Sequence, residues 1–255
     1  MKECFNEARD VRRRSFRSLR PEGGNLEAPE EQVKNDLVRQ PGQRQVNREK
    51  RLTEIIEASL QVFADEGYAG YSLRKVAAVA DIRLSTIQHH FGDLNSLLLA
   101  TIRVMMDGYV EQYSRLAAAD SLSPRERLLN MLDDIFGESR KPEVRKFFFE
   151  MWTFANHDPA AALLVEKAYS GYVGAIAHLV RGMEPELAAF EARVIASMIA
   201  AWTEGLVVLA QYGRADDELL AEVVALMKAQ CISLFRAADD ADILKTKVVD
   251  GSGHE

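Results

Sequence analysis

The sequence contains few of the residues that interrupt helices or cross-link a fold. Only 7 prolines and 15 glycines occur among 255 residues, so long helices are possible. The 2 cysteines, Cys4 and Cys231, are too few for a disulfide framework or a four-thiolate zinc site. No apolar run approaches the roughly 18 residues of a membrane span, and no secretory signal opens the chain. We therefore expect a cytoplasmic protein that does not enter a membrane.

Acidic residues outnumber basic ones, but the excess is confined to one part of the chain. The net charge is −7. Residues 1–103 contain 17 Lys and Arg against 15 Asp and Glu, whereas residues 104–255 contain 15 against 24. This division is compatible with a DNA-facing N-terminal part and an acidic remainder.

The first 45 residues differ in composition from the rest. They contain several prolines and glycines and few large apolar side chains, and five arginines fall between Arg12 and Arg20. This composition favours a disordered extension over residues 1–45. Two alternatives remain open. One is a basic arm that contacts phosphates. The other is a segment upstream of the true start of translation, which would need a non-Met start codon because the next methionine is Met105.

The segment after the extension carries the pattern of one long helix and two short ones. Apolar residues at helical spacing predict a first helix that begins at an N-cap, Asn47, and stops at Gly67. Ser72 is the expected N-cap of a second helix. Residues 81–83 are predicted to form a tight connection into a third helix over residues 84–90. This order is that of a helix-turn-helix arrangement with a leading support helix.

The third of these helices is expected to present short polar side chains to solvent. Its outward residues are Leu84, Ser85, Thr86, Gln88 and His89. No acidic residue lies among them to repel phosphates, and Gln88 could pair with adenine through two hydrogen bonds. The alternative is an ordinary solvated helix face. His89 and His90 do not predict a metal site, because adjacent side chains on a helix point about 100° apart and no Cys or acidic pattern completes one.

Beyond residue 104 the whole chain is predicted to be helical. Helix starts are indicated by Ser123–Pro124, Pro142, Asp158–Pro159 and Pro185. The last two helices are expected over residues 185–212 and 216–237, separated by a stop at Gly213. No internal repeat and no strand pattern is visible, so the predicted fold class is all-α.

The pattern around the turn resembles the TetR family of bacterial transcriptional regulators. The matching residues are Phe63 to Tyr68, Ser72, Val76, Ala77, Ala80, Ile82, His90, Phe91, Leu97 and Leu98. The segment from Trp152 to Pro159 is similar to the C-terminal domain of the choline-responsive BetI-type subgroup. Three positions depart from the family pattern. Asp81 stands where glycine is usual, Gln88 where an aromatic residue is frequent, and Leu94 where a phosphate-contacting lysine is found.

The resemblance implies a dimer that binds operator DNA through the third helix. The residues assigned to DNA binding are Arg48, Arg51, Ser72, Arg74, Arg83, Leu84, Ser85, Thr86, Gln88, His89 and His90. Arg48 and Arg51 would contact phosphates or the minor groove, although ordinary solvated charge explains them equally well. His90 resembles the phosphate-contacting histidine of the family. A two-fold dimer would place its recognition helices about 34–36 Å apart, in successive major grooves of a palindromic operator.

Aromatic residues in the second half could line an effector cavity. The expected lining residues are Phe148, Trp152, Tyr169, Tyr172 and Trp202, with His157, His178 and Glu204 as polar groups. Aromatic walls suit a cation or a flat ligand. Plain core packing is the alternative explanation for each of these residues.

The last two helices carry broad apolar stripes. The stripe residues are Ile195, Ile199, Leu206, Leu209, Leu219, Val223, Leu226, Met227 and Leu234. The resemblance implies that these residues form a four-helix interface with the same helices of a second copy. The core of a monomer would produce similar stripes.

The sequence thus predicts an all-α, homodimeric, ligand-responsive transcriptional regulator. Residues 46–92 are expected to form the helix-turn-helix DNA-binding domain, residues 93–238 a helical effector-binding and dimerisation domain, and residues 239–255 a flexible tail. We expect a repressor that leaves its operator when a small-molecule effector binds. No glycine-rich phosphate loop or nucleophile elbow is visible, so we expect no enzyme activity, no cofactor and no metal. Two alternatives remain: a helical enzyme that uses the aromatic cavity, and a protein-interaction module that keeps the fold without DNA binding.

Overall fold

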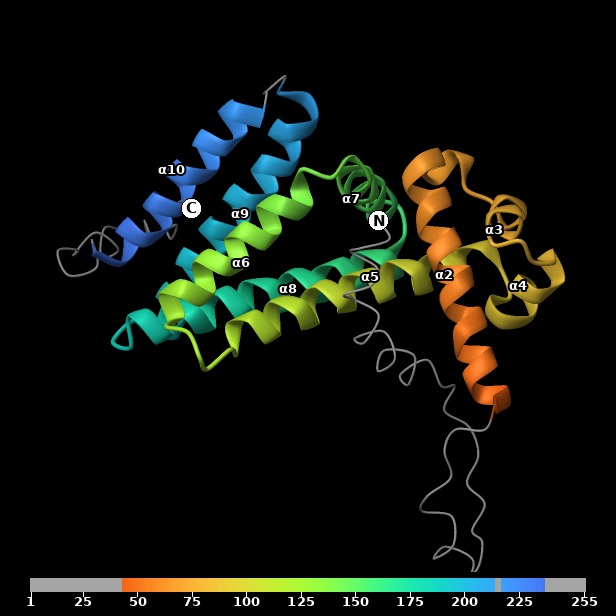
Figure 1. Ribbon diagram of the computed structural model, residues 1–255, viewed down its shortest axis with the longest axis horizontal. Helices are drawn as coiled ribbons and strands as arrows, with labels where there is room; N and C mark the ends of the chain where they lie inside the picture. The colour runs from red at the N-terminus through yellow and green to blue at the C-terminus, as the bar shows by residue number, and fades with distance from the viewer. Residues whose placement is uncertain (1–42, 214–216, 237–255) are drawn as a thin grey trace, which may run out of the picture. The chain divides into compact units, whose positions relative to one another are not determined.

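The computed structural model describes residues 43–213 and 217–236, and the regular structure in these ranges is entirely helical (Figure 1). The helices are α2 Gln43–Gly70, α3 Leu73–Val79, α4 Leu84–Phe91, α5 Leu94–Ala117, α6 Pro124–Ser139, α7 Pro142–Ala155, α8 Pro159–Met183, α9 Ala189–Tyr212 and α10 Asp217–Arg236. The predicted all-α class is therefore confirmed. The predicted extension, apart from residues 43–45 in α2, and the predicted tail over residues 239–255 lie outside the described residues.

Four of the described helices, α3, α5, α6 and α8, begin directly after a side chain that caps them. Ser72 and Asp93 accept hydrogen bonds from the backbone N–H three residues on, at 3.3 and 2.7 Å. Ser123 forms a capping box with Glu126, whose carboxylate accepts the Ser123 backbone N–H at 2.8 Å. Asp158 caps α8 by accepting the Ala161 N–H at 2.9 Å. These starts are local events, because the side chain that satisfies the first N–H groups lies within the same turn.

The first described helix differs from its predicted bounds at both ends. It begins at Gln43, so Asn47 lies inside the helix and is not its N-cap. At the other end Gly67 interrupts the helix with φ 67° and ψ 176°, and helical structure continues to Gly70. Glycine adopts this positive φ without a Cβ clash, which is why the predicted stop appears as a break at that residue.

The start predicted at Pro185 is wrong. Residues 185 and 186 form a turn, and α9 begins at Ala189. The Ala188 N–H is satisfied by the carboxylate of Glu191, which accepts it at 3.0 Å. A proline can occupy a turn as readily as the first position of a helix, so its presence alone does not fix a helix start.

The helices form two compact units, each with its own core. The first contains the described residues up to Gln112 and the segment Lys141–Tyr169, and the second contains Tyr113–Arg140 and the described residues from Ser170 onward. Completely buried side chains of the first unit include Ile55, Phe63, Val76, Ile87, Leu97 and Met151. Those of the second unit include Leu128, Met131, Ile176, Val180 and Ile199.

One described helix, α9, is long and apolar enough to cross a membrane by length and composition. Its most apolar 18-residue window has a mean hydropathy of 1.6, and a third of that window is buried within the chain. A core helix of a soluble protein passes the same test, and Ala192, Ala196 and Ile199 of α9 are completely buried. The apolar surface that remains exposed on this helix is described with the predicted dimer residues below.

Candidate nucleic-acid interface

The turn between α3 and α4 is fixed by buried apolar side chains and by backbone hydrogen bonds. Val76 of α3 and Ile87 of α4 are completely buried, and Ala77 is 7% exposed. The Ile82 N–H donates to the Ala77 carbonyl at 3.0 Å, and the Ile82 side chain packs against the same core. Because Ile87 faces the core, the opposite face of α4 points to solvent.

Asp81 gives this turn its unusual backbone conformation. Its φ is +51°, and no other non-glycine residue that the structure describes has a positive φ. The left-handed region is open to glycine without strain and is tolerated by Asp better than by most other residues. The position where the related pattern has glycine is therefore one where the backbone itself favours glycine.

The exposed face of α4 carries most of the residues predicted to contact bases. Ser85, Gln88 and His89 are exposed, and Thr86 and His90 are partly buried. Leu84 is partly buried and packs against the core of the first unit, so it contributes less to this face than predicted. The remaining groups are hydrogen-bond donors and acceptors without a carboxylate, which is the chemistry that reads base edges in a major groove.

Basic side chains from two helices lie beside this face. Burial lowers the pKa of His90 below its usual value, and the positive charges of His89, Arg48 and Arg51 lower it further. Residues of α2 and α4 that the sequence assigns to DNA binding thus share one electropositive patch. Arg51 Nη1 also lies 2.9 Å from Glu54 Oε2.

Basic residues of α3 and of the turn complete the set. Arg74 and Arg83 are exposed, whereas Ser72 is partly buried and caps α3. Lys75 forms an ion pair with Glu66, with Nζ and Oε2 2.7 Å apart. The Lys75 ammonium is thus held by a carboxylate of the same unit.

Leu94, where the related pattern has a phosphate-contacting lysine, directs its side chain into the protein. Leu94 is partly buried and packs against the core of the first unit. The neighbouring Asn95 donates to Asp158 Oδ2 at 3.1 Å. At the start of α5 these side chains serve packing and a helix-to-helix hydrogen bond.

The effector residues predicted in the first unit form an aromatic cluster. The rings of Phe148 and Trp152 have centroids 5.8 Å apart, and Trp152 Nε1 donates to the Tyr169 hydroxyl at 3.1 Å. All three are partly buried, whereas His157 is exposed. The cluster brings together the aromatic residues predicted from this segment but not the histidine.

The effector residues predicted in the second unit differ in how far they are buried. Tyr172 is 8% exposed, and its hydroxyl is 2.8 Å from Thr203 Oγ1. Burial raises the pKa of Tyr172 far above its usual value. Trp202 and Glu204 are partly buried, and His178 is exposed. Thr203 was missed, although a lone hydroxyl in the apolar stripe of α9 could have indicated a buried hydrogen bond.

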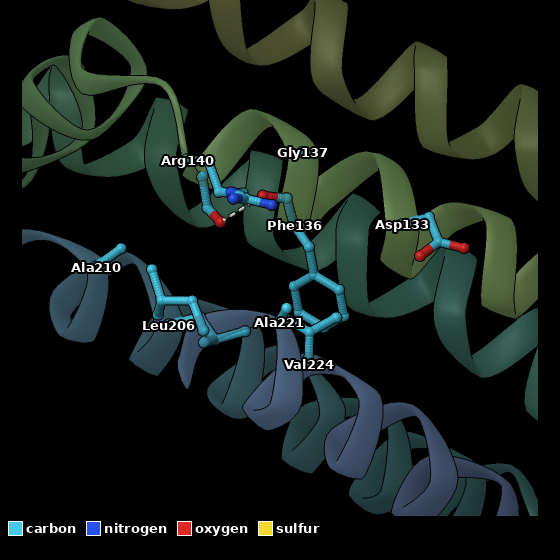
Figure 2. Close-up of a pocket in the computed structure, with 10 residues that line it drawn as sticks. Asp133, Phe136, Gly137, Arg140, Leu206, Ala210, Ala221 and Val224 are labelled. Carbon is cyan, nitrogen blue, oxygen red and sulfur yellow. Dashed lines mark hydrogen bonds between the residues drawn. The ribbon is translucent and has the colours of Figure 1, made fainter. Parts of the chain in front are cut away.

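The second unit contains a cavity that sequence reasoning missed. It has a volume of about 250 Å³ and lies between α6, α9 and α10 (Figure 2). Its lining includes Phe136, Arg140, Leu206 and Leu220. None of the predicted effector residues lines it. Small residues on all three helices are the one signal for it in the sequence.

The predicted dimer residues divide between the core and the surface. Ile199 and Leu206 are 0% and 4% exposed within the single chain, so they pack in its own core and this part of the prediction is corrected. Leu219 and Leu226 are exposed. The partly buried members are Ile195, Leu209, Val223, Met227 and Leu234. The sequence stripe missed the exposed apolar side chains Phe190, Val194, Val208 and Tyr212, which lie on other faces of α9.

Comparison with known proteins assigns both parts of the chain. Residues 55–101 match the family described as bacterial regulatory proteins, tetR family, and residues 124–238 match the BetI-type transcriptional repressor, C-terminal, family. The chain is 30% identical over 164 residues to the HTH-type transcriptional regulator BetI of Burkholderia thailandensis. The aligned residues cover 62% of this chain and 80% of that protein.

Solved structures share the fold at lower sequence identity. A transcriptional regulator from Rhodococcus sp. Rha1 aligns with a TM-score of 0.60 and 18% identity, over 71% of this chain and 96% of that one. A protein from Saccharomonospora viridis, crystallised in complex with choline, aligns with a TM-score of 0.59 and 19% identity, over 73% and 96%.

The matched families and relatives are transcriptional regulators, which are not enzymes. Regulators of this kind bind DNA, form dimers and bind small-molecule effectors. They are bacterial and normally soluble and cytoplasmic. The helix-turn-helix segment, the helical remainder and the relatives agree: the chain belongs to the TetR family of bacterial transcriptional regulators, with a C-terminal domain of the BetI type.

Proposed function

We propose that this chain is a cytoplasmic, dimeric repressor that binds a palindromic operator and leaves it when a small-molecule effector binds. The observation that carries the proposal is the exposed polar face of α4. Ser85 and Gln88 point to solvent on a helix that the buried Ile87 fixes against the core. A rigid, carboxylate-free helix face beside basic residues is suited to a major groove.

Within this proposal the DNA-binding residues have two roles. Ser85, Thr86, Gln88 and His89 contact base edges, of which Gln88 can pair with adenine. The remaining predicted residues position the helix on phosphates, and these are Arg48, Arg51, Ser72, Arg74, Arg83 and His90. Phosphate contacts fix the register of the helix, whereas base contacts determine the preferred sequence.

The proposed dimer forms through α9 and α10. Phe190 and Tyr212 of α9 are 75% and 66% exposed, and Leu226 of α10 is 64% exposed. Large apolar side chains exposed to this extent on neighbouring helices are typical of a surface that a partner covers. A second copy is the partner that a two-fold operator requires.

Effector binding is assigned to the helical part over residues 93–238. The aromatic faces of Phe148, Trp152 and Tyr169 suit a cation or a flat ligand. The choline bound to the Saccharomonospora viridis protein is a cation of this kind. An effector that prefers a state with altered spacing of the recognition helices releases the operator, and a difference of a few kcal/mol between states is sufficient.

The test is a selection of random duplex DNA on the purified protein at two salt concentrations. We expect one palindrome with half-sites about one helical turn apart. It should be bound more weakly at high salt, because the release of counterions from the DNA, which favours binding, gains less entropy in concentrated salt. Failure to enrich any sequence at either salt, before and after removal of bound small molecules, would contradict operator binding. Release of the recovered operator is then measured with choline and with flat aromatic compounds.

A further inference from the structure

One face of α9 is exposed although the helix is strongly apolar. Its most apolar 18-residue window has a mean hydropathy of 1.6, and only a third of that window is buried within the chain. Phe190 and Tyr212 are 75% and 66% exposed, and Val194 and Val208 are 39% and 46% exposed. Their spacing places these four residues on one outward face of the helix, apart from the residues that pack in the core. Such a continuous apolar face indicates a surface that another molecule covers.

The sizes of the side chains on this face follow the same order in both directions from Ala201. Aromatic residues stand 11 positions from Ala201 on either side, valines seven positions away, and the small residues serine and glycine four positions away. In chain order the residues of the face are Phe190, Val194, Ser197, Ala201, Gly205, Val208 and Tyr212. The three small residues at its centre are also exposed, so the whole face points to solvent in the single chain.

We propose that α9 packs on α9 of a second copy in antiparallel orientation, with the two-fold axis of the dimer passing beside Ala201. This inference rests on the dimer of the proposed function, and it adds where the axis lies and which residues meet. In an antiparallel two-fold pair, a residue before the axis meets the partner's residue at the same distance after it. Such a contact requires a size pattern that is alike in both directions, whereas a parallel contact makes no such demand.

The axis at Ala201 pairs side chains of matching size. Phe190 meets the partner's Tyr212, and Val194 meets the partner's Val208, and the symmetry repeats each pair on the other side of the axis. Both pairs remove exposed apolar surface from water, and two aromatic rings gain a further attraction when they meet edge to face or offset. Straight helices that cross at an angle diverge away from the crossing point. The larger side chains at the two ends of the face therefore fill the wider gap there.

Gly205 supports a close approach at the centre of this contact. Glycine is unfavourable inside a helix compared with alanine. A Cβ at Gly205 would meet no atom of its own chain within 4 Å, and the backbone there does not have a positive φ. The packing and conformation of the single chain therefore do not require glycine at this position. A second helix that crosses beside Ala201 does, because residue 205 then faces the partner's Ser197.

The antiparallel orientation also suits the electrostatics of the helix backbone. The N-terminus of a helix carries a partial positive charge and its C-terminus a partial negative charge. An antiparallel pair places the start of each α9, at Ala189, beside the end of the partner's α9, at Tyr212. The two partial charges then attract, whereas a parallel pair places like charges side by side.

Single cysteines locate the axis. Ala201→Cys, Val194→Cys and Val208→Cys are each made in the full-length protein with Cys4→Ser, and Cys231 is kept because it is 1% exposed. A disulfide needs Cα atoms within about 7 Å. The two copies of residue 201 meet this condition at the axis, whereas the two copies of residue 194 lie about 21 Å apart along the helix, at 1.5 Å per residue. After oxidation with diamide, we expect a covalent dimer from Ala201→Cys and none from either valine variant.

A double variant tests the pairing across the axis. Within one chain, residues 194 and 208 are about 21 Å apart along the helix and cannot form a disulfide with each other. In the proposed dimer each of them faces the other residue of the partner. We therefore expect Val194→Cys/Val208→Cys to form a covalent dimer although neither single variant does. A parallel pair would instead cross-link both single variants.

A matched pair of glycine variants tests the close approach. Gly205→Leu places a large side chain at the centre of the contact, whereas Gly174→Leu makes the same change on the exposed surface of α8. A Cβ meets no atom of the chain within 4 Å at either position, and leucine is a better helix former than glycine, so both variants should fold. Sedimentation equilibrium should show dimer dissociation at least tenfold stronger in Gly205→Leu and unchanged in Gly174→Leu.

Three results would overturn the proposal: a dimer in which Ala201→Cys does not cross-link, a covalent dimer from either single valine variant, and unchanged dimer affinity in Gly205→Leu. Operator binding is measured on the same samples under reducing conditions. A dimer that binds its operator but does not cross-link at residue 201 contradicts only the proposed axis. A protein that cross-links at residue 201 but binds no operator contradicts only the proposed function, and a monomeric protein contradicts both.

Discussion

The Glu150 carboxylate of α7 accepts a hydrogen bond of 2.8 Å from the backbone N–H of Tyr68, directly after the break of α2 at Gly67. Nearby, Lys146 Nζ of α7 lies 3.9 Å from Asp65 Oδ1 of α2. The rings of Tyr68 and Phe154 are also stacked at a tilt, 4.8 Å apart. The end of the support helix is thus held against α7 by its backbone as well as by its side chains.

Gly67→Ala should destabilise the protein by about 1–2 kcal/mol, because φ at this position is positive and an L side chain is strained there. The added Cβ would also lie 2.9 Å from the Glu150 carboxylate, which would have to move. Urea unfolding followed by circular dichroism measures the loss. The control is Gly137→Ala, where the helix is regular and the space open, and a gain of up to about 1 kcal/mol is expected. Equal stability of Gly67→Ala and wild type would contradict the strain argument.

Asp81→Gly should stabilise the protein by about 0.5–1 kcal/mol. Glycine relieves the left-handed strain at φ +51°, and its greater freedom in the unfolded chain offsets part of the gain. Asp81→Val should instead cost about 2 kcal/mol, because a β-branched residue is strongly disfavoured at positive φ. The measurement is the urea midpoint of both variants. If valine were tolerated as well as glycine, the backbone would not be constraining the turn.

The starts of the helices could be predicted from the sequence because they depend on local contacts. Ser72, Asp93 and Ser123 each satisfy N–H groups in their own first turn, so the sequence around them is sufficient. The helix start predicted at Pro185 was wrong because proline is also common in turns. The placement of Ile87 on the buried face of α4, which exposes Gln88, followed from helical periodicity alone.

The cavity and the burial of the dimer stripe could not be predicted in this way. The space around Phe136 depends on how α6 approaches α9 and α10, and α6 is far from these two helices in sequence. Ile199 and Leu206 are apolar at the same spacing as Leu219, yet the first two are buried and the third is exposed. Periodicity identifies an apolar face but does not say whether the same chain or a partner covers it.

His90 should make the folded state less stable at acidic pH. Burial and the neighbouring positive charges lower the pKa of His90 in the folded protein below the value near 6.5 expected for the unfolded chain. The unfolded state therefore binds the proton first, so the contribution of His90 to stability is present above pH 6.5 and is lost as pH falls through its folded pKa. Urea midpoints between pH 5 and 8 should fall less steeply toward acid in His90→Gln. Parallel curves for the two proteins would contradict this assignment.

The affinity for the operator should depend on pH through His90 in the opposite direction to the stability. A phosphate beside His90 raises its pKa in the complex, so a proton is taken up on binding and the affinity falls as pH rises. His90→Gln should flatten this dependence. The operator dissociation constant is measured over the same pH range, and a wild-type affinity that does not change between pH 5.5 and 8 would place His90 away from phosphate.

Arg74 and Gln88 should affect DNA binding in different ways. Arg74→Ala should weaken binding to all DNA sequences by the same factor, because one phosphate contact is lost. It should also reduce the slope of log affinity against log salt concentration by about 1. Gln88→Ala should relax the preference at one base pair, at a cost of about 1–3 kcal/mol on the preferred site only. Fluorescence anisotropy on the selected palindrome and a scrambled duplex separates the two effects. Arg181→Ala, an exposed arginine of the second unit, is the control and should change neither quantity.

A relay of buried hydroxyl groups joins α2 to α5 in the first unit. Thr101 Oγ1 donates its only hydrogen to the Leu97 carbonyl at 2.8 Å, so it must accept from Ser59 Oγ, which lies 2.6 Å away. Ser59 has then used its own hydrogen and accepts from the Tyr71 hydroxyl at 2.5 Å. Ser59 and Thr101 are completely buried, and burial raises the pKa of Tyr71 to about 12. The direction of donation in this relay therefore runs from Tyr71 to Ser59 to Thr101.

This order predicts that Ser59→Ala should destabilise the protein more than Tyr71→Phe. Removal of the Ser59 hydroxyl leaves the Tyr71 O–H buried without its acceptor, at a cost of about 1–3 kcal/mol. Removal of the Tyr71 hydroxyl takes away a donor and leaves only lone pairs on Ser59, so the loss should be nearer the 1 kcal/mol of an ordinary hydrogen bond. The double variant should lose less than the sum of the two, because the orphaned O–H is then absent. Urea unfolding of all three variants measures these differences, and additive losses would show that the two hydroxyls do not act as one relay.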